Sequence, residues 1–90
     1  MNKEEFNREI LFLSGFGGVE NFSEFNYKFS VGNSLYCMSD IGLKFFIAWK
    51  QVGEEFIILS HGHGSSGSKN VYNVYLSEIE NERKYSSTIY

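Results

Sequence analysis

The sequence has no proline and only one cysteine, Cys37, among its 90 residues. A single cysteine excludes an internal disulfide, so the stability of this short chain has to come from its hydrophobic core. There is also no apolar run near the roughly 20 residues that a membrane-spanning helix needs. Because no secretory n-region or h-region opens the sequence, we expect a soluble protein of the reducing cytoplasm.

Positive charge is scarce as well. The eight lysines and arginines are scattered along the chain, and the net charge is −3. A general nucleic-acid-binding protein needs a basic patch to neutralise phosphates, so we do not expect nucleic acid as a partner. Alanine occurs once and arginine twice, whereas Asn, Lys, Ile, Tyr and Phe are abundant. That balance is typical of AT-rich genomes and indicates a bacterial or phage source, without saying anything about function.

The first segment predicts a helix. Asn2 can cap it, and Glu5 follows at the spacing of a capping box. Gly15 can end the helix after Ser14, because glycine is common at that position. The apolar stripe of this helix consists of Phe6, Ile10, Leu11 and Leu13.

Beyond residue 18 the hydrophobic period changes to two, which predicts antiparallel strands. Gly32-Asn33 and Gly53 mark hairpin turns. A helix could also account for the apolar run at 43–49, but its aromatic content and flanking glycines favour a strand. The predicted strands are 25–31, 35–39, 43–50, 55–60 and 71–79.

We therefore predict a single α+β domain over residues 1–90, in which an N-terminal helix is followed by a five-stranded antiparallel meander sheet. The segment 80–90 is polar until Ile89-Tyr90. The sequence leaves open whether this tail is flexible or docks.

The segment 61–69, predicted to be a loop, is the most suggestive stretch for a ligand. Gly62 and Gly67 have the spacing of a phosphate-binding P-loop, but Ser68 stands at its lysine position and a strand pattern follows, so we do not assign one. The open alternatives are a cradle for a small anion and a mobile hairpin loop. The candidate ligand-binding residues are His61, His63, Ser65, Ser66, Ser68 and Lys69.

Catalytic and metal-binding patterns are weak. The two histidines have no further zinc ligand at a recognisable local spacing. A serine nucleophile on a glycine-rich loop would lack the orienting carboxylate of a triad, and Cys37 falls in an alternating strand as a small core residue. We expect no catalytic residue, metal or cofactor, although a small hydrolase using the histidines stays open as a third reading. Alternation of Glu78, Glu80 and Glu82 predicts either a solvated strand edge or an acidic contact stripe.

Apolar residues fall on both faces of the predicted sheet. One helix can cover only one face, and soluble monomers seldom expose large apolar patches. We therefore expect a cover on the second face, from a second copy of the chain, from a target protein, or from the loop at 15–22 together with the C-terminal tail. The predicted interface residues are Phe46, Trp49, Phe56, Tyr72 and Tyr75.

These observations favour a non-enzymatic binding protein whose partner is another macromolecule, of the type of an immunity protein or a phage-encoded inhibitor of a host defence. A homodimer is the expected assembly. The alternative is an oligomeric protein that sequesters a small anionic ligand, such as a nucleotide signal, through residues 61–69. An inhibitor should lose activity when exposed aromatic or acidic residues change, a sequestering protein when His61, His63 or Lys69 changes.

Overall fold

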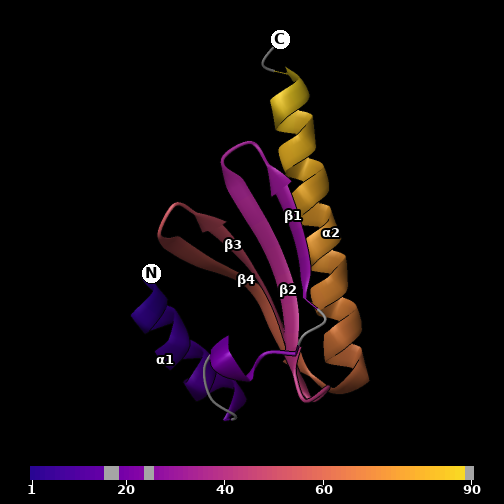
Figure 1. Ribbon diagram of the computed structural model, residues 1–90. Coiled ribbons are helices and arrows are strands. Elements are labelled where there is room, and N and C mark those ends of the chain that lie inside the picture. The colour runs from indigo at the N-terminus through magenta and orange to yellow at the C-terminus, as the bar shows by residue number, and fades with distance from the viewer. Residues whose placement is uncertain (16–18, 24–25, 89–90) are drawn as a thin grey trace.

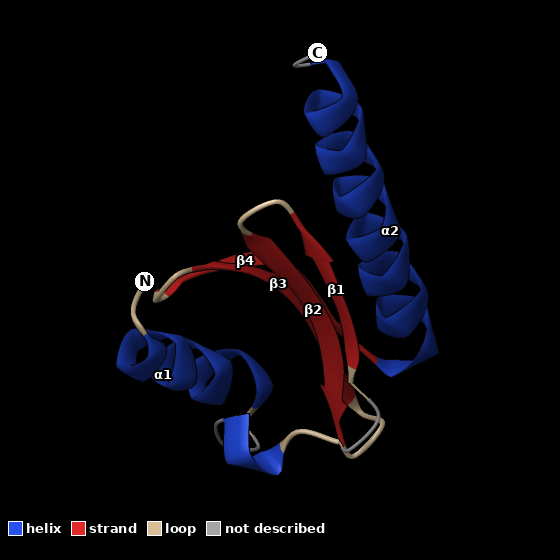
Figure 2. Ribbon diagram, turned by 45° about the horizontal axis from the view of Figure 1, so that its top comes forward, coloured by secondary structure: helices blue, strands red, loops and turns tan. Residues whose placement is uncertain are grey.

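The computed structural model describes residues 1–15, 19–23 and 26–88. Its elements are α1 (Lys3–Ser14), the short 3-10 helix η1 (Val19–Asn21), β1 (Tyr27–Val31), β2 (Ser34–Ile41), β3 (Phe45–Val52), β4 (Glu55–His63) and α2 (Gly64–Thr88). The strands form one antiparallel sheet in the order β1-β2-β3-β4. Figures 1 and 2 show α1 and α2 on opposite faces of this sheet. The α+β class and the meander are confirmed, but the described sheet has four strands rather than five.

The N-terminal helix forms as its caps predict. The side chain of Asn2 accepts a hydrogen bond from the Glu5 N–H at 2.8 Å, and the Glu5 carboxylate accepts one from the Asn2 N–H at 3.1 Å. Gly15 takes a left-handed φ of 74°, and its N–H donates to the Leu11 carbonyl at 2.9 Å. The side chains that α1 buries are Phe6, Ile10 and Ser14. Leu11 is 53% exposed, so the buried stripe is narrower than predicted.

The hairpins lie at the predicted glycines. Tight turns at 32–33 and 53–54 join β1 to β2 and β3 to β4. The apolar run at 43–49 contributes to β3 and is not a helix. Ala48 pairs with Ser60 and Trp49 with Ile58, so Leu59 is an extra residue that forms a bulge in β4. Phe25, the first residue of the first predicted strand, lies outside the described residues.

The predicted fifth strand is wrong, because residues 71–79 belong to α2. The buried side chains of this segment are Val71, Tyr75 and Ile79, spaced four residues apart. Residues four apart lie on one face of a helix and also on one face of a strand, so this spacing fits both periods. Strand-favouring residue types decided the prediction towards a strand, and packing against the sheet overrides that weak preference.

The predicted loop at 61–69 is wrong as well. Residues 61–63 extend β4, and α2 begins at Gly64, whose φ is 70° and whose N–H donates to the Lys44 carbonyl at 2.9 Å. A Cβ on Gly67 would lie 2.6 Å from the carbonyl carbon of Gly62, and a Cβ on Gly62 would lie 2.8 Å from the Gly67 Cα. The two glycines therefore allow the start of α2 to pack directly on the backbone of β4.

Two hydrophobic clusters lie on the two faces of the sheet. The α1-face cluster contains Phe6, Ile10, Cys37, Ile41, Phe45, Ile47, Trp49 and Phe56. The α2-face cluster contains Val31, Tyr36, Met38, Ala48, Val71, Tyr75 and Ile79. The second face is thus covered by the chain's own α2, and the premise that a single helix leaves it bare is wrong.

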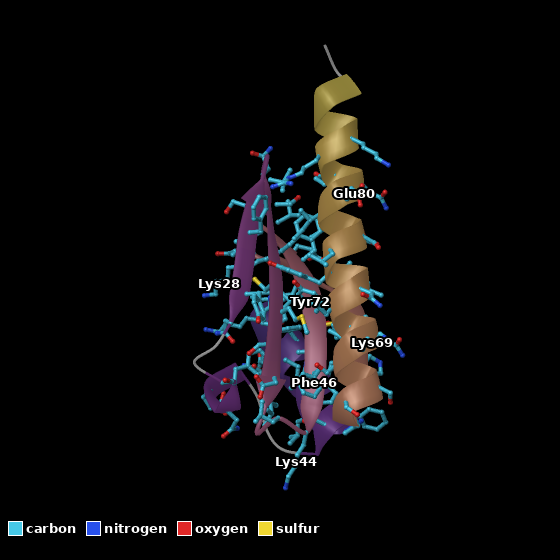
Figure 3. The ribbon with its side chains drawn as sticks, turned by 90° about the vertical axis from the view of Figure 1, so that its right-hand side faces the viewer. Lys28, Lys44, Phe46, Lys69, Tyr72 and Glu80 are labelled. Atoms are coloured by element: carbon cyan, nitrogen blue, oxygen red, sulfur yellow. The ribbon has the colours of Figure 1, made fainter. Side chains whose placement is uncertain are left out.

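The segment 80–88 also continues α2, and Figure 1 shows this end of the helix running past the sheet. The Arg83 guanidinium lies 4.5 Å from the centre of the Phe29 ring, a cation–π contact with β1. Glu82 forms a side-chain hydrogen bond with Tyr36, whereas Figure 3 shows Glu80 pointing away from the sheet. Glu78, Glu80 and Glu82 therefore do not line one strand face. None of the described helices combines the length and apolarity needed to cross a membrane.

Candidate functional site

The structure does not bring the six predicted ligand residues together. His61 and His63 lie on the α1 side of β4, both exposed, with ring centres 6.3 and 5.1 Å from that of Phe45. Ser68 lies on the other side of the sheet, where it lines a hollow with Met38. Figure 3 shows Lys69 pointing outward from α2. The histidines and the lysine therefore cannot hold one small anion between them.

Ser65 and Ser66 are exposed in the first turn of α2. A helix does follow the strand here, so the strand pattern that argued against a P-loop is wrong. The backbone contact between Gly62 and Gly67 nevertheless gives their spacing a packing role. The glycines of this segment are thus explained by the junction of β4 with α2.

The hollow beside Ser68 has a volume of about 290 Å³ and is lined by Tyr27 and Asp40 among others. Asp40 is buried, and its Oδ2 accepts a hydrogen bond from the Leu43 N–H at 2.8 Å. Leu43 has a φ of 58°, a left-handed conformation that is costly for a branched side chain. The Asp40 carboxylate therefore holds the β2–β3 turn, which accounts for its burial without a ligand.

Most of the predicted interface residues belong to the core. Trp49 and Phe56 are buried in the α1-face cluster, and Tyr75 is buried in the α2-face cluster. Phe46 is half-buried and packs against the α2-face cluster. Only Tyr72 is exposed. The prediction is wrong about exposure at the three buried positions. Trp49 and Phe56 pack against Phe6 of α1, and Tyr75 belongs to α2, the helix that was taken for a strand.

Exposed apolar side chains do gather along β1 and α2. Four of them, each between 38% and 56% exposed, form what we term the tyrosine surface: Tyr27, Phe29, Tyr72 and Leu76. The Tyr27 and Tyr72 ring centres are 5.9 Å apart, and both rings lie near that of Tyr75 at 6.4 and 6.5 Å. Leu76 follows Tyr72 by one helical turn. β1 is an edge strand, so its outer side adjoins this surface.

A second hollow, of about 530 Å³, lies on the α1 face between the start of α1 and strands β1 and β3. We term it the Trp49 hollow. The described residues that line it are Lys3, Phe22, Ser23, Asn26, Lys28, Trp49, Gln51 and Phe56. No carboxylate is among these lining residues, although Glu4 and Glu54 line a neighbouring hollow of about 400 Å³.

Trp49 is 6% exposed, and its Nε1 is buried with no acceptor among the described residues. Its ring is held by Phe6 and Phe22, with ring centres at 5.3 and 5.2 Å. Most buried polar groups in proteins are hydrogen-bonded, and each exception needs a physical explanation. The indole N–H is therefore a buried donor whose hydrogen-bond partner is missing from the part of the chain that the structure describes.

The hollow is bordered by two lysines. Neither Lys3 nor Lys28 forms an ion pair with a described carboxylate. Burial raises the pKa of the Cys37 thiol to about 11, and the Lys28 ammonium, which lies close enough to act on it, opposes that rise. Cys37 is thus a buried neutral thiol in the core, as predicted, and Lys28 gives this part of the α1 face a positive charge.

Sequence reasoning missed this hollow. Lys28 pairs with Cys37, which pairs with Trp49, so the three residues form one row across the sheet. The turns at 32–33 and 42–44 fix that row, and an alignment of the predicted strands could have found it. Lys3 could not have been found in this way, because its place depends on how α1 docks.

No family model matches the sequence, and no curated protein or solved structure is similar enough to count as a match. Among residues 1–15, 19–23 and 26–88, no three His, Cys, Asp or Glu side chains lie where they could hold a metal ion.

Proposed function

We propose that this chain is a non-enzymatic binding protein of the cytoplasm whose partner is another protein, in the manner of an immunity protein or a phage-encoded inhibitor acting in the host cell. The observation that carries the proposal is the tyrosine surface beside the outer edge of β1. Tyrosine is enriched among the residues that dominate binding energy at protein interfaces, because its ring is large and its hydroxyl stays hydrated.

The edge of β1 adds a second kind of contact. Among the described residues, the β1 backbone bonds only to β2, so its outer N–H and C=O groups are open to an added strand. At the other edge of the sheet, Met1 already occupies part of β4: its carbonyl accepts a hydrogen bond from the Phe56 N–H at 2.7 Å. The two edges therefore differ in what they offer a partner, and β1 is the more accessible.

A second copy of the chain is the other occupant to consider. The case for a dimer rested on a bare second face of the sheet, and α2 covers that face. The mass of a homodimer formed through the tyrosine surface would distinguish it from a complex with a different protein. We favour a different protein because the tyrosine surface is a patch of only four exposed side chains, and the large bare face that argued for a dimer is covered by α2.

The proposal is tested by placing a photo-activatable amino acid at position 72 in the cell that naturally produces the protein. Position 69, which points outward from α2, is the matched control. We expect a covalent adduct of one defined mass from position 72 and none from position 69. The partner identified in the adduct is then purified, and its affinity is measured for the wild type and for the Tyr27→Ser, Leu76→Ser double variant.

A loss of affinity of at least tenfold in the double variant, with unchanged circular dichroism, supports the tyrosine surface. An adduct of twice the mass of the chain, together with a light-scattering mass that rises with concentration, would show that the partner is a second copy of the chain. Absence of an adduct, or equal adducts from positions 69 and 72, overturns the proposal.

The alternative function, sequestration of a small anionic ligand, was based on a loop at 61–69. In the structure these residues belong to β4 and α2 instead. The site at 61–69 is divided between the two sides of the sheet, so it gives that function no support.

A further inference from the structure

The hollow beside Ser68, which we term the Asp40 hollow, continues the tyrosine surface. Tyr27 belongs to both, and Ser68 lies one helical turn before Tyr72 on α2. Strand β1 begins at Tyr27, which pairs with Met38, so β1 does not extend alongside Asp40. The hollow therefore lies beyond the start of β1, between β2 and the first turns of α2.

The Asp40 carboxylate has one oxygen that the rest of the described chain does not bind. Its Oδ2 accepts from the Leu43 N–H, and this bond holds the β2–β3 turn. Among the described residues, no donor reaches its Oδ1, and no lysine or arginine forms an ion pair with the carboxylate. Asp40 is nevertheless only 7% exposed. A carboxylate removed from water to this extent is normally paired with a cation or held by several hydrogen bonds, so this one is incompletely satisfied.

The unbound oxygen keeps some accessible surface. Among the described residues, Trp49 Nε1 is the one fully enclosed polar side-chain atom without a partner, so Asp40 Oδ1 is not enclosed. An ionised carboxylate has about four acceptor positions, of which the Leu43 N–H occupies one. Because Asp40 lines the hollow, a donor placed there has acceptor positions to bind.

The wall around Asp40 is mostly apolar. Its rings and alkyl groups come from Tyr27, Met38, Leu43 and Phe46, and the hydroxyls of Ser23 and Ser68 add polar atoms. Tyr27 and Leu43 are 56% and 76% exposed, so an incoming group meets them first. An apolar wall around one carboxylate suits lysine and arginine, which pack an apolar stem against such a surface and carry a charged head. The volume of about 290 Å³ is just below the roughly 300–1,000 Å³ of common small-molecule pockets, which favours a single side chain as the occupant.

We propose that the protein partner of the tyrosine surface inserts a lysine or arginine side chain into the Asp40 hollow, where its head group donates to Asp40 Oδ1 and its stem packs against Tyr27 and Leu43. This inference rests on the proposed function and names the chemistry that its partner must supply. A charge pair surrounded by aromatic and apolar groups that exclude water is a common centre of binding energy at protein interfaces. The net charge of −3 also favours the approach of a basic surface.

The hollow is first tested on the full chain by itself, with capped amino acids as probes. N-acetyl-arginine methylamide and N-acetyl-lysine methylamide are titrated into isotope-labelled protein, and the amide signal of Leu43, which donates to Asp40, is followed by NMR. The corresponding citrulline and norleucine derivatives keep the stem without the charge and are the neutral controls. We expect a saturable shift from at least one cationic probe with a dissociation constant below about 10 mM, and none from its neutral control.

Two variants connect probe binding to this hollow. Asp40→Asn keeps an acceptor for the Leu43 N–H but removes the charge, so it should weaken the cationic probe by about tenfold or more. Glu80→Gln is the matched control, since it removes an equal charge from a side chain that points away from the sheet. Ser68→Leu should also block the probe, because it fills the hollow from α2 and leaves Asp40 in place. Its control is Ser66→Leu, at an exposed position of the same helix. If Asp40→Asn does not fold, the Ser68→Leu pair still decides the matter.

The partner captured from position 72 gives the second test. Asp40→Asn should weaken its binding at least tenfold. Replacing the inserted lysine or arginine of the partner by glutamine should then cost little more, because two residues in direct contact do not have additive effects.

The failures of the two proposals are distinguishable. An adduct from position 72 whose partner binds wild type and Asp40→Asn equally well overturns this inference and leaves the proposed function standing. Lack of a saturable response to either cationic probe up to about 100 mM also overturns it, as does equal weakening by Glu80→Gln and Asp40→Asn. Absence of any adduct from position 72 overturns both proposals.

Discussion

The two faces of the sheet are covered in different ways. On the α1 face a 12-residue helix contributes aromatic packing, with Phe6 stacked on Phe56 at 4.8 Å. It leaves a hollow beside Lys28. On the α2 face a 25-residue helix runs along the sheet and is held by one close backbone contact and by polar links such as Tyr36 with Glu82. The α1 face therefore keeps a hollow of about 530 Å³, whereas the α2 face keeps a smaller one of about 290 Å³ beside Ser68.

The largest expected effect comes from the aromatic packing of the α1 face. Phe6→Ala should reduce the free energy of unfolding by about 3–5 kcal/mol, because it removes a fully buried ring and leaves a cavity against Trp49 and Phe56. Urea unfolding measures the change. Leu11→Ala, on the exposed side of the same helix, is the control and should change stability far less. Equal effects of the two variants would mean that α1 does not dock through Phe6.

The close contact on the α2 face should give the next largest effect. Gly67→Ala should destabilise the fold by about 1–3 kcal/mol, because the added methyl would lie 2.6 Å from the Gly62 carbonyl carbon and α2 would have to move away. Thermal and urea unfolding give the number. Ser66→Ala, one residue earlier and exposed, is the matched control. A Gly67→Ala protein as stable as the wild type would contradict the direct packing of α2 on β4.

A smaller effect, dependent on pH, is expected from the polar link on the same face. Burial, the nearby Glu82 and Glu78 carboxylates and the hydrogen bond with Glu82 raise the pKa of Tyr36 from 10.0 to about 12. The folded state therefore favours the neutral phenol. Its contribution to stability is complete below pH 10, and it is lost as the pH rises from 10 to about 12.

Tyr36→Phe should consequently reduce stability by about 1.5 kcal/mol at neutral pH, the usual size for a hydrogen bond to a charged group. Above pH 10 the difference between the two proteins should shrink. Burial also raises the pKa of Tyr75, but that residue is present in both proteins and cancels in the comparison. A constant difference across the alkaline range would show that the Tyr36 hydroxyl does not titrate with folding.

The smallest effect is expected on the outer side of α2. Lys69→Ala should change stability by less than about 0.5 kcal/mol, because the side chain points into solvent. His63→Ala is a useful comparison, since the imidazole is also exposed but its ring centre lies 5.1 Å from that of Phe45. Thermal unfolding of both variants distinguishes a solvated residue from one that shields the core. A large loss of stability in Lys69→Ala would place that lysine in a structural contact.

Local signals predicted the first half of the chain well. The capping box of Asn2 and Glu5, the C-terminal Gly15 and the hairpin at Gly32-Asn33 each depend on neighbouring residues, so the sequence alone was sufficient to locate α1, β1 and β2. The same reasoning failed where two periods coincide. Val71, Tyr75 and Ile79 fit one face of a strand as well as one face of a helix. The strand-favouring residue types in this segment led to the prediction of a strand, whereas the structure has a helix.

The candidate sites also contain some features that the sequence could predict and others that it could not. The exposure of Tyr72 and the alternation that places Lys28 and Trp49 on one face could be predicted from the sequence. The burial of Trp49, Phe56 and Tyr75 could not, because it depends on which helix covers which face. Likewise, the sequence around Gly62 and Gly67 predicts a flexible loop, and only the structure shows that the backbones of these two glycines are in contact.

The sequence by itself determined the elements whose ends are set by capping, turn chemistry and alternation, since those interactions span only a few residues. The tertiary structure alone decided that residues 64–88 form a helix, that this helix covers the second face of the sheet, and that Lys3, Lys28 and Trp49 meet around one hollow. The physical reason is that helix propensity is a weak preference, whereas burying Val71, Tyr75 and Ile79 against the sheet is a strong and cooperative gain that no local pattern records.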